Sequence, residues 1–182
     1  MNFLDLLKEI GDMSRFCLTI ADMRQEDFPL IHVNEKFENL TEYNLEEVKN
    51  NNCRFLQGPD TDKKVTRRLK ESLVKRQASI ADLKNYKKDG TPFWNRLVML
   101  PLKISEGDFF FGVQHKITEE MVMEGSIYMD EEHIMDSIMN PLFVAFCGME
   151  EILKKSNEKE NIAEVIKNLD RISDFVLTLT KH

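Results

Sequence analysis

Apolar and polar residues follow one another along this chain with two different periods, and each change of period marks a new structural element. Residues 2–10 place apolar side chains at helical spacing on one face, and Gly11 is expected to end that helix. The apolar runs 16–21 and 30–33 are short and rich in β-branched residues, which is typical of strands. A polar stretch separates them, so the pattern predicts a hairpin with a long loop.

Helix-start signals follow the second predicted strand. Asn34 is expected to cap a short helix, and Asn44 with Glu47 forms a capping-box pattern that opens another. Apolar residues then recur every four positions from Asp62 to Arg76, which predicts a longer helix. Three helices are therefore expected between the first strand pair and the rest of the chain.

Three longer strands are predicted next, at residues 79–86, 93–104 and 109–117. Turn sequences join them, and Asp89-Gly90 is the stronger of the two turn signals. Two strands, a group of helices and three more strands predict an α+β fold, in which an antiparallel five-stranded sheet carries helices on one face.

After Thr118 the pattern becomes helical to the end of the chain. Apolar residues recur at three and four positions on both sides of a polar turn at 155–160, which predicts an antiparallel helical hairpin over 119–182. One hairpin leaves an apolar face uncovered. We therefore expect two copies to pair as a four-helix bundle, so that the protein is a homodimer through its C-terminal helices.

Composition excludes several classes of protein. The formal net charge is -7 and no basic stretch stands out, which argues against a nucleic-acid partner. No apolar run approaches the ~20 residues of a membrane span, and the start lacks the basic region of a signal peptide. Three widely spaced cysteines form neither a disulfide framework nor a metal site. A cytoplasmic protein without a metal is the expectation.

The densest chemistry lies in residues 51–62, NNCRFLQGPDTD. Arg54 offers a planar fork that suits a phosphate. Asn52 and Gln57 can each donate and accept hydrogen bonds, as the edge of a heteroaromatic ring requires. Cys53 lies between them; taken alone, a cysteine in such a protein is more often inert core than a reactive thiol.

The sequence NCRFLQ followed by GPDTD resembles the signature of LOV domains, the flavin-binding blue-light sensors of the PAS superfamily. Three further amides match the positions that grip the flavin ring in that family: Asn85 in KNYKKDG, Asn95 in PFWN and Gln114 in FFGVQ. The resemblance implies a PAS core over residues 15–118, preceded by an N-terminal helix over 1–14.

The resemblance also implies a mechanism and a binding site. The cofactor would be FMN, and light would join the Cys53 sulfur to flavin carbon C4a while N5 gains a proton. The Gln114 amide would flip in response to the new proton at N5, and this change would alter the last strand. The implied cofactor-binding residues are Asn52, Arg54, Leu56, Gln57, Arg67, Lys70, Asn85, Asn95, Leu97, Met99, Phe111 and Gln114.

The phosphate-binding residue departs from the family pattern. LOV domains commonly have an arginine seventeen residues after the cysteine, and this chain has Lys70 there. Lys70 can still act as a point charge. Arg67 and Arg68 are alternatives on the same predicted helix, and FAD or riboflavin remain alternatives to FMN.

The C-terminal segment carries a second resemblance. Residues 136–142, DSIMNPL, are similar to the phosphoacceptor box of sensor histidine kinases, but Asp136 stands where the acceptor histidine belongs. His133 lies one turn earlier. Three interpretations remain open: a plain dimerisation bundle, a degenerate remnant that docks a histidine kinase or response regulator, and a phosphotransfer protein that uses His133.

We expect a signalling protein rather than an enzyme. Two other functions on the same scaffold compete with light sensing. A flavin redox sensor would need no thiol near C4a, and a haem- or metabolite-binding PAS domain would not need the amide set.

Overall fold

Two N-terminal strands and three C-terminal strands form one antiparallel sheet. The computed structural model describes residues 3–13, 17–104 and 106–123. Its elements are α1 (Phe3–Met13), β1 (Cys17–Asp22), β2 (Leu30–Val33), α2 (Glu35–Thr41), α3 (Leu45–Val48), the 3-10 helix η1 (Cys53–Leu56), α4 (Lys63–Lys75), β3 (Ser79–Tyr86), β4 (Pro92–Ile104), β5 (Gly107–Ile117) and α5 (Glu119–Met123).

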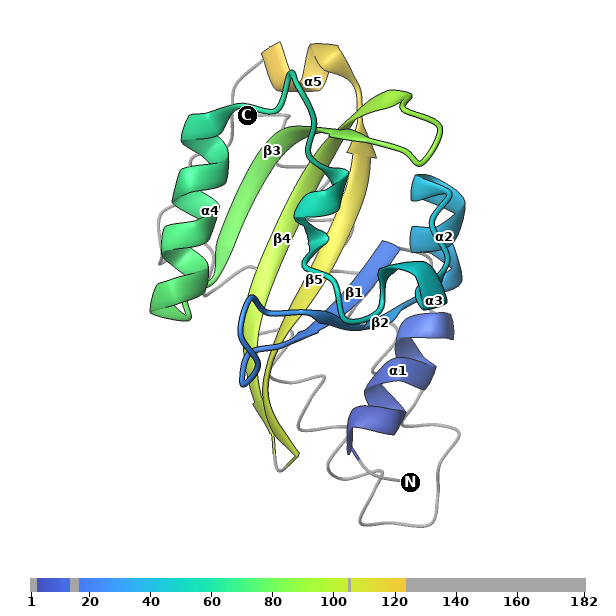
Figure 1. The fold of residues 1–182 in the computed structure, drawn as a ribbon, viewed down its shortest axis with the longest axis vertical. Coiled ribbons are helices and arrows are strands. Elements are labelled where there is room, and N and C mark those ends of the chain that lie inside the picture. Colours follow the sequence, from blue (N-terminus) through green and yellow to red (C-terminus); the bar gives the residue numbers. More distant parts are fainter. Residues whose placement is uncertain (1–2, 14–16, 105, 124–182) are drawn as a thin grey trace.

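The strand order β2-β1-β5-β4-β3 places the last strand in the middle of the sheet, between β1 and β4. Helices α2, α3 and α4 lie in front of the same face of this sheet (Figure 1). This arrangement confirms the predicted α+β class with helices on one face.

Helix α1 is longer than the sequence pattern predicts. It continues through Gly11 to Met13. Gly11 is buried, and a Cβ atom there would lie 3.1 Å from Cδ2 of Leu18 in β1. The glycine therefore permits close packing of α1 on the sheet, and the interpretation of Gly11 as a helix end was wrong.

The predicted helix caps are confirmed. Asn34 and Asn44 both lie in extended backbone just before a helix, and each side chain accepts a hydrogen bond from the helix N-terminus. Glu47 completes the capping box with Asn44. Asp62 caps α4, and Arg76 ends it in a left-handed conformation. Local side-chain chemistry thus sets where these helices begin.

Asn34 also joins three elements. Its Oδ1 accepts from the backbone nitrogens of Leu18 at 2.9 Å and Phe37 at 3.1 Å, and its Nδ2 donates to the Gly11 carbonyl at 2.9 Å. Only 1% of the residue is exposed. The side chain therefore satisfies buried backbone groups of α1, β1 and α2 together.

Replacing Asn34 with alanine should lower the free energy of unfolding by about 2 kcal/mol, since it removes a cap and leaves buried polar groups unpaired. The shift is measured by urea unfolding. Asn39→Ala is the control, because Asn39 lies exposed on the same helix, α2. Equal urea midpoints for the two variants would contradict the role of Asn34 in joining α1, β1 and α2.

Most of the predicted helical hairpin lies outside the described residues. Of segment 119–182, the structure describes α5, whose start is capped by Thr118 through the Met121 nitrogen at 3.4 Å. Asp136 and His133 both lie outside the described part. No helix among the described residues is long and apolar enough to cross a lipid bilayer.

Candidate functional site

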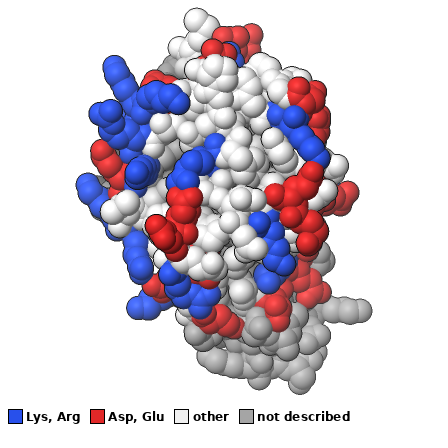
Figure 2. Space-filling view, in the orientation of Figure 1, with Lys and Arg blue, Asp and Glu red and all other residues white. Residues whose placement is uncertain are grey.

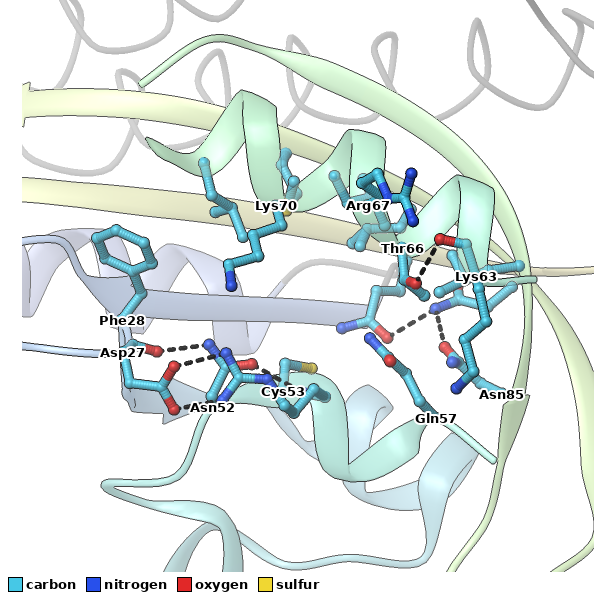
Figure 3. Close-up of a pocket in the computed structure, with 18 of the residues that line it drawn as sticks. Asp27, Phe28, Asn52, Cys53, Gln57, Lys63, Thr66, Arg67, Lys70 and Asn85 are labelled. Carbon is cyan, nitrogen blue, oxygen red and sulfur yellow. Dashed lines mark hydrogen bonds and ion pairs between the residues drawn. The ribbon is translucent and has the colours of Figure 1, made fainter. Parts of the chain in front are cut away.

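A cavity of about 600 Å³ lies between the sheet, η1 and α4. That volume is within the range of small-molecule binding sites. Figure 3 shows 18 of the residues that line it. The full set of lining residues is Asp27, Phe28, Asn52, Cys53, Arg54, Gln57, Lys63, Thr66, Arg67, Leu69, Lys70, Leu73, Val74, Leu83, Asn85, Asn95, Leu97, Met99 and Gln114.

The segment containing Cys53 is held against β3 at one wall of the cavity. Asn52 caps η1 by accepting from the Arg54 nitrogen at 2.9 Å. After η1, Gln57 forms a bridge with Asn85 of β3. A Cβ at Gly58 would lie 2.3 Å from the Tyr86 ring, so only glycine lets the backbone pass this close. The loop geometry thus turns Cys53 towards the cavity.

The floor of the cavity is one face of the sheet. Cross-strand pairs place Leu97 opposite Gln114 and Leu83 opposite Asn95. Met99 lies two residues beyond Leu97 on the same face. Side chains on a strand alternate between faces, so three strands bring apolar groups and amides together without any sequence proximity.

Three buried amides form a chain across this floor. Nδ2 of Asn95 donates to Oδ1 of Asn85 at 2.8 Å and to Oε1 of Gln114 at 3.2 Å. All three residues are at most 3% exposed. Yet Oδ1 of Asn95 and Nε2 of Gln114 have no hydrogen-bond partner among the described residues. Buried polar atoms are normally paired, so one acceptor and one donor here fit a polar ligand in the cavity.

Burial raises the pKa of the Cys53 thiol to about 12. The residue keeps some accessible surface and lines the cavity, and it also packs against the apolar cluster that contains Leu56 and Val48. At neutral pH the thiol therefore holds its proton. Cys17, buried in the same cluster, also has a raised pKa, first because of burial and then because of Cys53.

Alkylation of Cys53 by iodoacetamide in the flavin-free protein should be about a thousandfold slower at pH 8 than that of an ordinary thiol, because only the thiolate reacts. The rate should keep rising with pH towards 12 and not level off near 9. Peptide mass spectrometry measures the rate at Cys53, and the urea-unfolded chain is the control. A pH profile that matches the unfolded chain would contradict the burial of the thiol.

Positive charge follows α4 along one side of the cavity. Helix α4 carries six basic residues and one acidic residue, and Figure 2 shows Lys and Arg along the side of the molecule where α4 lies. Lys63, Arg67 and Lys70 of this helix line the cavity. Lys70 points from α4 towards Asp27 and Asn52, whereas Lys63 lies beside Asn85 (Figure 3). The end of the cavity near Lys70 therefore suits an anionic group.

Asp27 opposes these cations from the loop between β1 and β2. Both of its carboxylate oxygens accept from the Arg54 guanidinium. These hydrogen bonds hold the pKa of Asp27 below its ordinary value, and the charge of Lys70 lowers it further. Asn52 donates to the Asp27 carbonyl from the same side.

The cavity brings together all the predicted site residues except Leu56 and Phe111. Leu56 packs below η1 with Phe37 and Val48. Phe111 is three positions from Gln114 on β5, so it faces the opposite side of the sheet, opposite Leu100 and Ile20. The interpretation of these two residues as cavity walls does not agree with their placement.

Eight lining residues were not predicted from the sequence. Leu69 and Leu73 were signalled by the apolar face of α4, and Lys63 by its charge. Leu83 could have been found by its alternation with Asn85. No local pattern singled out Asp27 or Phe28, because a loop has no period. The others are Thr66 and Val74.

Within residues 3–13, 17–104 and 106–123, no three or more histidine, cysteine, aspartate and glutamate side chains cluster so that they could hold a metal ion.

Residues 17–119 match the PAS domain family model. The blue-light-activated histidine kinase 1 of Erythrobacter litoralis is 33% identical over 176 residues, which are 96% of this chain and 48% of that protein. The blue-light photoreceptor of Listeria monocytogenes is 38% identical over 117 residues, 64% of this chain and 46% of that protein. The chain thus spans about half the length of these two relatives.

Solved structures agree with the sequence relatives. The LOV domain of the Erythrobacter litoralis EL346 blue-light activated histidine kinase is 40% identical. It superposes with a TM-score of 0.55, over 58% of this chain and 98% of that domain. The RsLOV d2 variant superposes with a TM-score of 0.65 at 20% identity, which is a likeness of fold alone.

Proposed function

Because this chain belongs to the PAS domain family and its core is a LOV domain, we propose that it is a blue-light photoreceptor that holds FMN in the cavity beside Cys53. One observation carries the proposal. A protonated thiol lines the same cavity as a chain of amides that still has one acceptor and one donor without a partner among the described residues.

The lining residues fit the parts of a flavin mononucleotide. Asn85, Asn95 and Gln114 would pair with the polar edge of the ring, since amides match its alternating donors and acceptors. Leu97 and Met99 would cover its apolar surface. The phosphate would lie towards Lys70, Arg67 and Arg54, with Asn52 and Gln57 completing the polar contacts.

Cys53 would supply the reactive group. When bound, the flavin absorbs blue light and, once excited, offers ring carbon C4a to a thiol. The Cys53 sulfur would form a reversible bond to that carbon, and the thiol proton would pass to N5. A pKa of about 12 keeps this proton on the sulfur in the dark, so the thiol can supply both sulfur and proton.

Gln114 would carry the change into the sheet. Its Oε1 now accepts from Asn95 at 3.2 Å. If the amide rotates to present Oε1 to a newly protonated N5, its Nε2 comes towards Asn95 Nδ2, and two donors cannot pair. The hydrogen bond to Asn95 would break. Gln114 lies on β5, which leads directly to α5, so the change would reach the C-terminal segment.

We propose that segment 119–182 forms the output as a dimeric helical bundle. A second candidate is a phosphotransfer protein that uses His133. The 176-residue alignment with a blue-light-activated histidine kinase favours it, because that alignment extends beyond the PAS core. Incubation with a histidine kinase and labelled ATP separates the two, since a sensor without an acceptor stays unlabelled.

An absorption spectrum of the purified protein before and after a blue flash tests the photoreceptor proposal. A structured flavin band that bleaches and recovers in the dark is the expected result. A flavin band that does not bleach would contradict light sensing through Cys53 and favour a redox sensor. A colourless protein that does not take up added FMN would contradict flavin binding itself.

A further inference from the structure

We infer that Asp27 is a specificity-determining residue at the anionic-ligand end of the cavity. By holding the Arg54 guanidinium, its carboxylate lowers the preference of the site for FMN over riboflavin, which lacks the phosphate. The inference rests on the proposed flavin binding and goes beyond it, because it says which cations are available to a phosphate.

The Asp27–Arg54 pair is bidentate. Nη1 and Nη2 of Arg54 donate to separate oxygens of Asp27, with Nη2 at 2.5 Å. This geometry occupies the two N–H groups of the guanidinium that could otherwise donate to two phosphate oxygens in the same way. Both residues line the cavity, so the internal anion lies where the ligand's anion is expected.

The loop that carries Asp27 is held in a strained conformation. Asp27 and Phe28 have φ angles of 68° and 50°, in the left-handed region that bulky residues avoid. Asn52 donates a hydrogen bond to the Asp27 carbonyl. The rings of Phe28 and Phe110 pack edge to face, with their centroids 6.0 Å apart. Strain of this kind persists only where surrounding contacts impose it. These contacts hold the backbone of Asp27, and its half-exposed carboxylate lies at the edge of the cavity, where Arg54 holds it.

The other cations of the cavity are not neutralised in this way. Lys63, Arg67 and Lys70 line it, and no carboxylate in the described part of the chain forms an ion pair with them. Lys70 and Arg67 would carry most of the attraction for a phosphate dianion. Asp27 would weaken the contribution of Arg54 and repel the dianion directly, whereas riboflavin would feel neither effect.

Asp27→Asn tests the inference with little structural disturbance. Asparagine has the same shape, tolerates positive φ and keeps the backbone carbonyl that Asn52 binds. The ratio of FMN to riboflavin affinity should rise about tenfold, the scale of a charge interaction near the surface, while the riboflavin affinity stays unchanged. Quenching of flavin fluorescence on titration of the flavin-free protein gives both constants. Glu26→Gln is the control, because it removes the same charge from the same loop outside the cavity lining.

A double-mutant cycle that combines Asp27→Asn with Arg54→Gln gives a second measurement of the same interaction. In the wild-type chain the Arg54→Gln change should lower the affinity ratio by about tenfold, the scale of one lost charge near the surface. In the Asp27→Asn background the loss should be larger, because Arg54 is then free to form both hydrogen bonds with the phosphate. Equal losses in the two backgrounds would overturn the inference. If neither flavin binds, this inference and the proposed function fail together. If flavin binds and bleaches but Asp27→Asn leaves the ratio unchanged, only this inference fails.

Discussion

Cys53→Ala should retain the flavin and lose light-induced bleaching completely. The substitution removes one sulfur atom and leaves the Cβ, so the other cavity-lining residues keep their positions. The amide chain and the cationic end, which would supply most of the binding, do not depend on the thiol. No other described cysteine lines the cavity, since Cys17 belongs to the neighbouring apolar cluster.

The measurement compares flavin content and the blue-light difference spectrum of the variant and the wild-type chain. Cys17→Ala is the matched control, because it removes a second buried sulfur from the same cluster and should still bleach. Bleaching that persists in Cys53→Ala would contradict the assignment of Cys53 as the group that reacts with the flavin. Loss of the flavin would show that Cys53 mainly shapes the cavity.

Much of the fold could be predicted because its signals are local. The caps at Asn34 and Asn44 and the alternation along β3 each depend on a few neighbouring residues. The role of Gly11 was misinterpreted because it is not a local one. Its role is to let α1 approach Leu18, a packing requirement between two elements that the residues around Gly11 do not reveal.

The residues of the site also differ in how far the sequence could predict their roles. Asn85, Asn95 and Gln114 lie far apart in the sequence, and their common role was recognised by resemblance and not by spacing alone. The structure places them within hydrogen-bond distance. Phe111 could have been excluded by parity, since residues three apart on a strand face opposite sides. Asp27 could not have been found, because its importance comes from an ion pair with a residue 27 positions away.

The amide chain also suggests why this cavity should discriminate among ligands. Asn95 is its centre, since the same Nδ2 group serves Asn85 and Gln114. The unpaired Oδ1 of Asn95 adds an acceptor directed at whatever fills the cavity. A site with buried, preoriented amides strongly rejects a ligand that leaves them unpaired.

Asn95→Ala should therefore weaken flavin binding by up to about a hundredfold, because the ligand loses one buried polar partner, which costs roughly 1–3 kcal/mol. Fluorescence titration of the flavin-free protein gives the dissociation constant. Thermal unfolding without flavin shows whether the fold is intact.

Asn39→Ala is the control, because Asn39 is an exposed asparagine on α2, away from the cavity lining. An Asn95→Ala protein that folds normally and binds flavin as tightly as the wild-type chain would show that the amides pair with one another and not with the ligand. Since Asn95 Oδ1 is buried and unpaired among the described residues, we expect the weaker binding. A riboflavin titration should show the same loss as FMN, because Asn95 is proposed to contact the ring and not the phosphate.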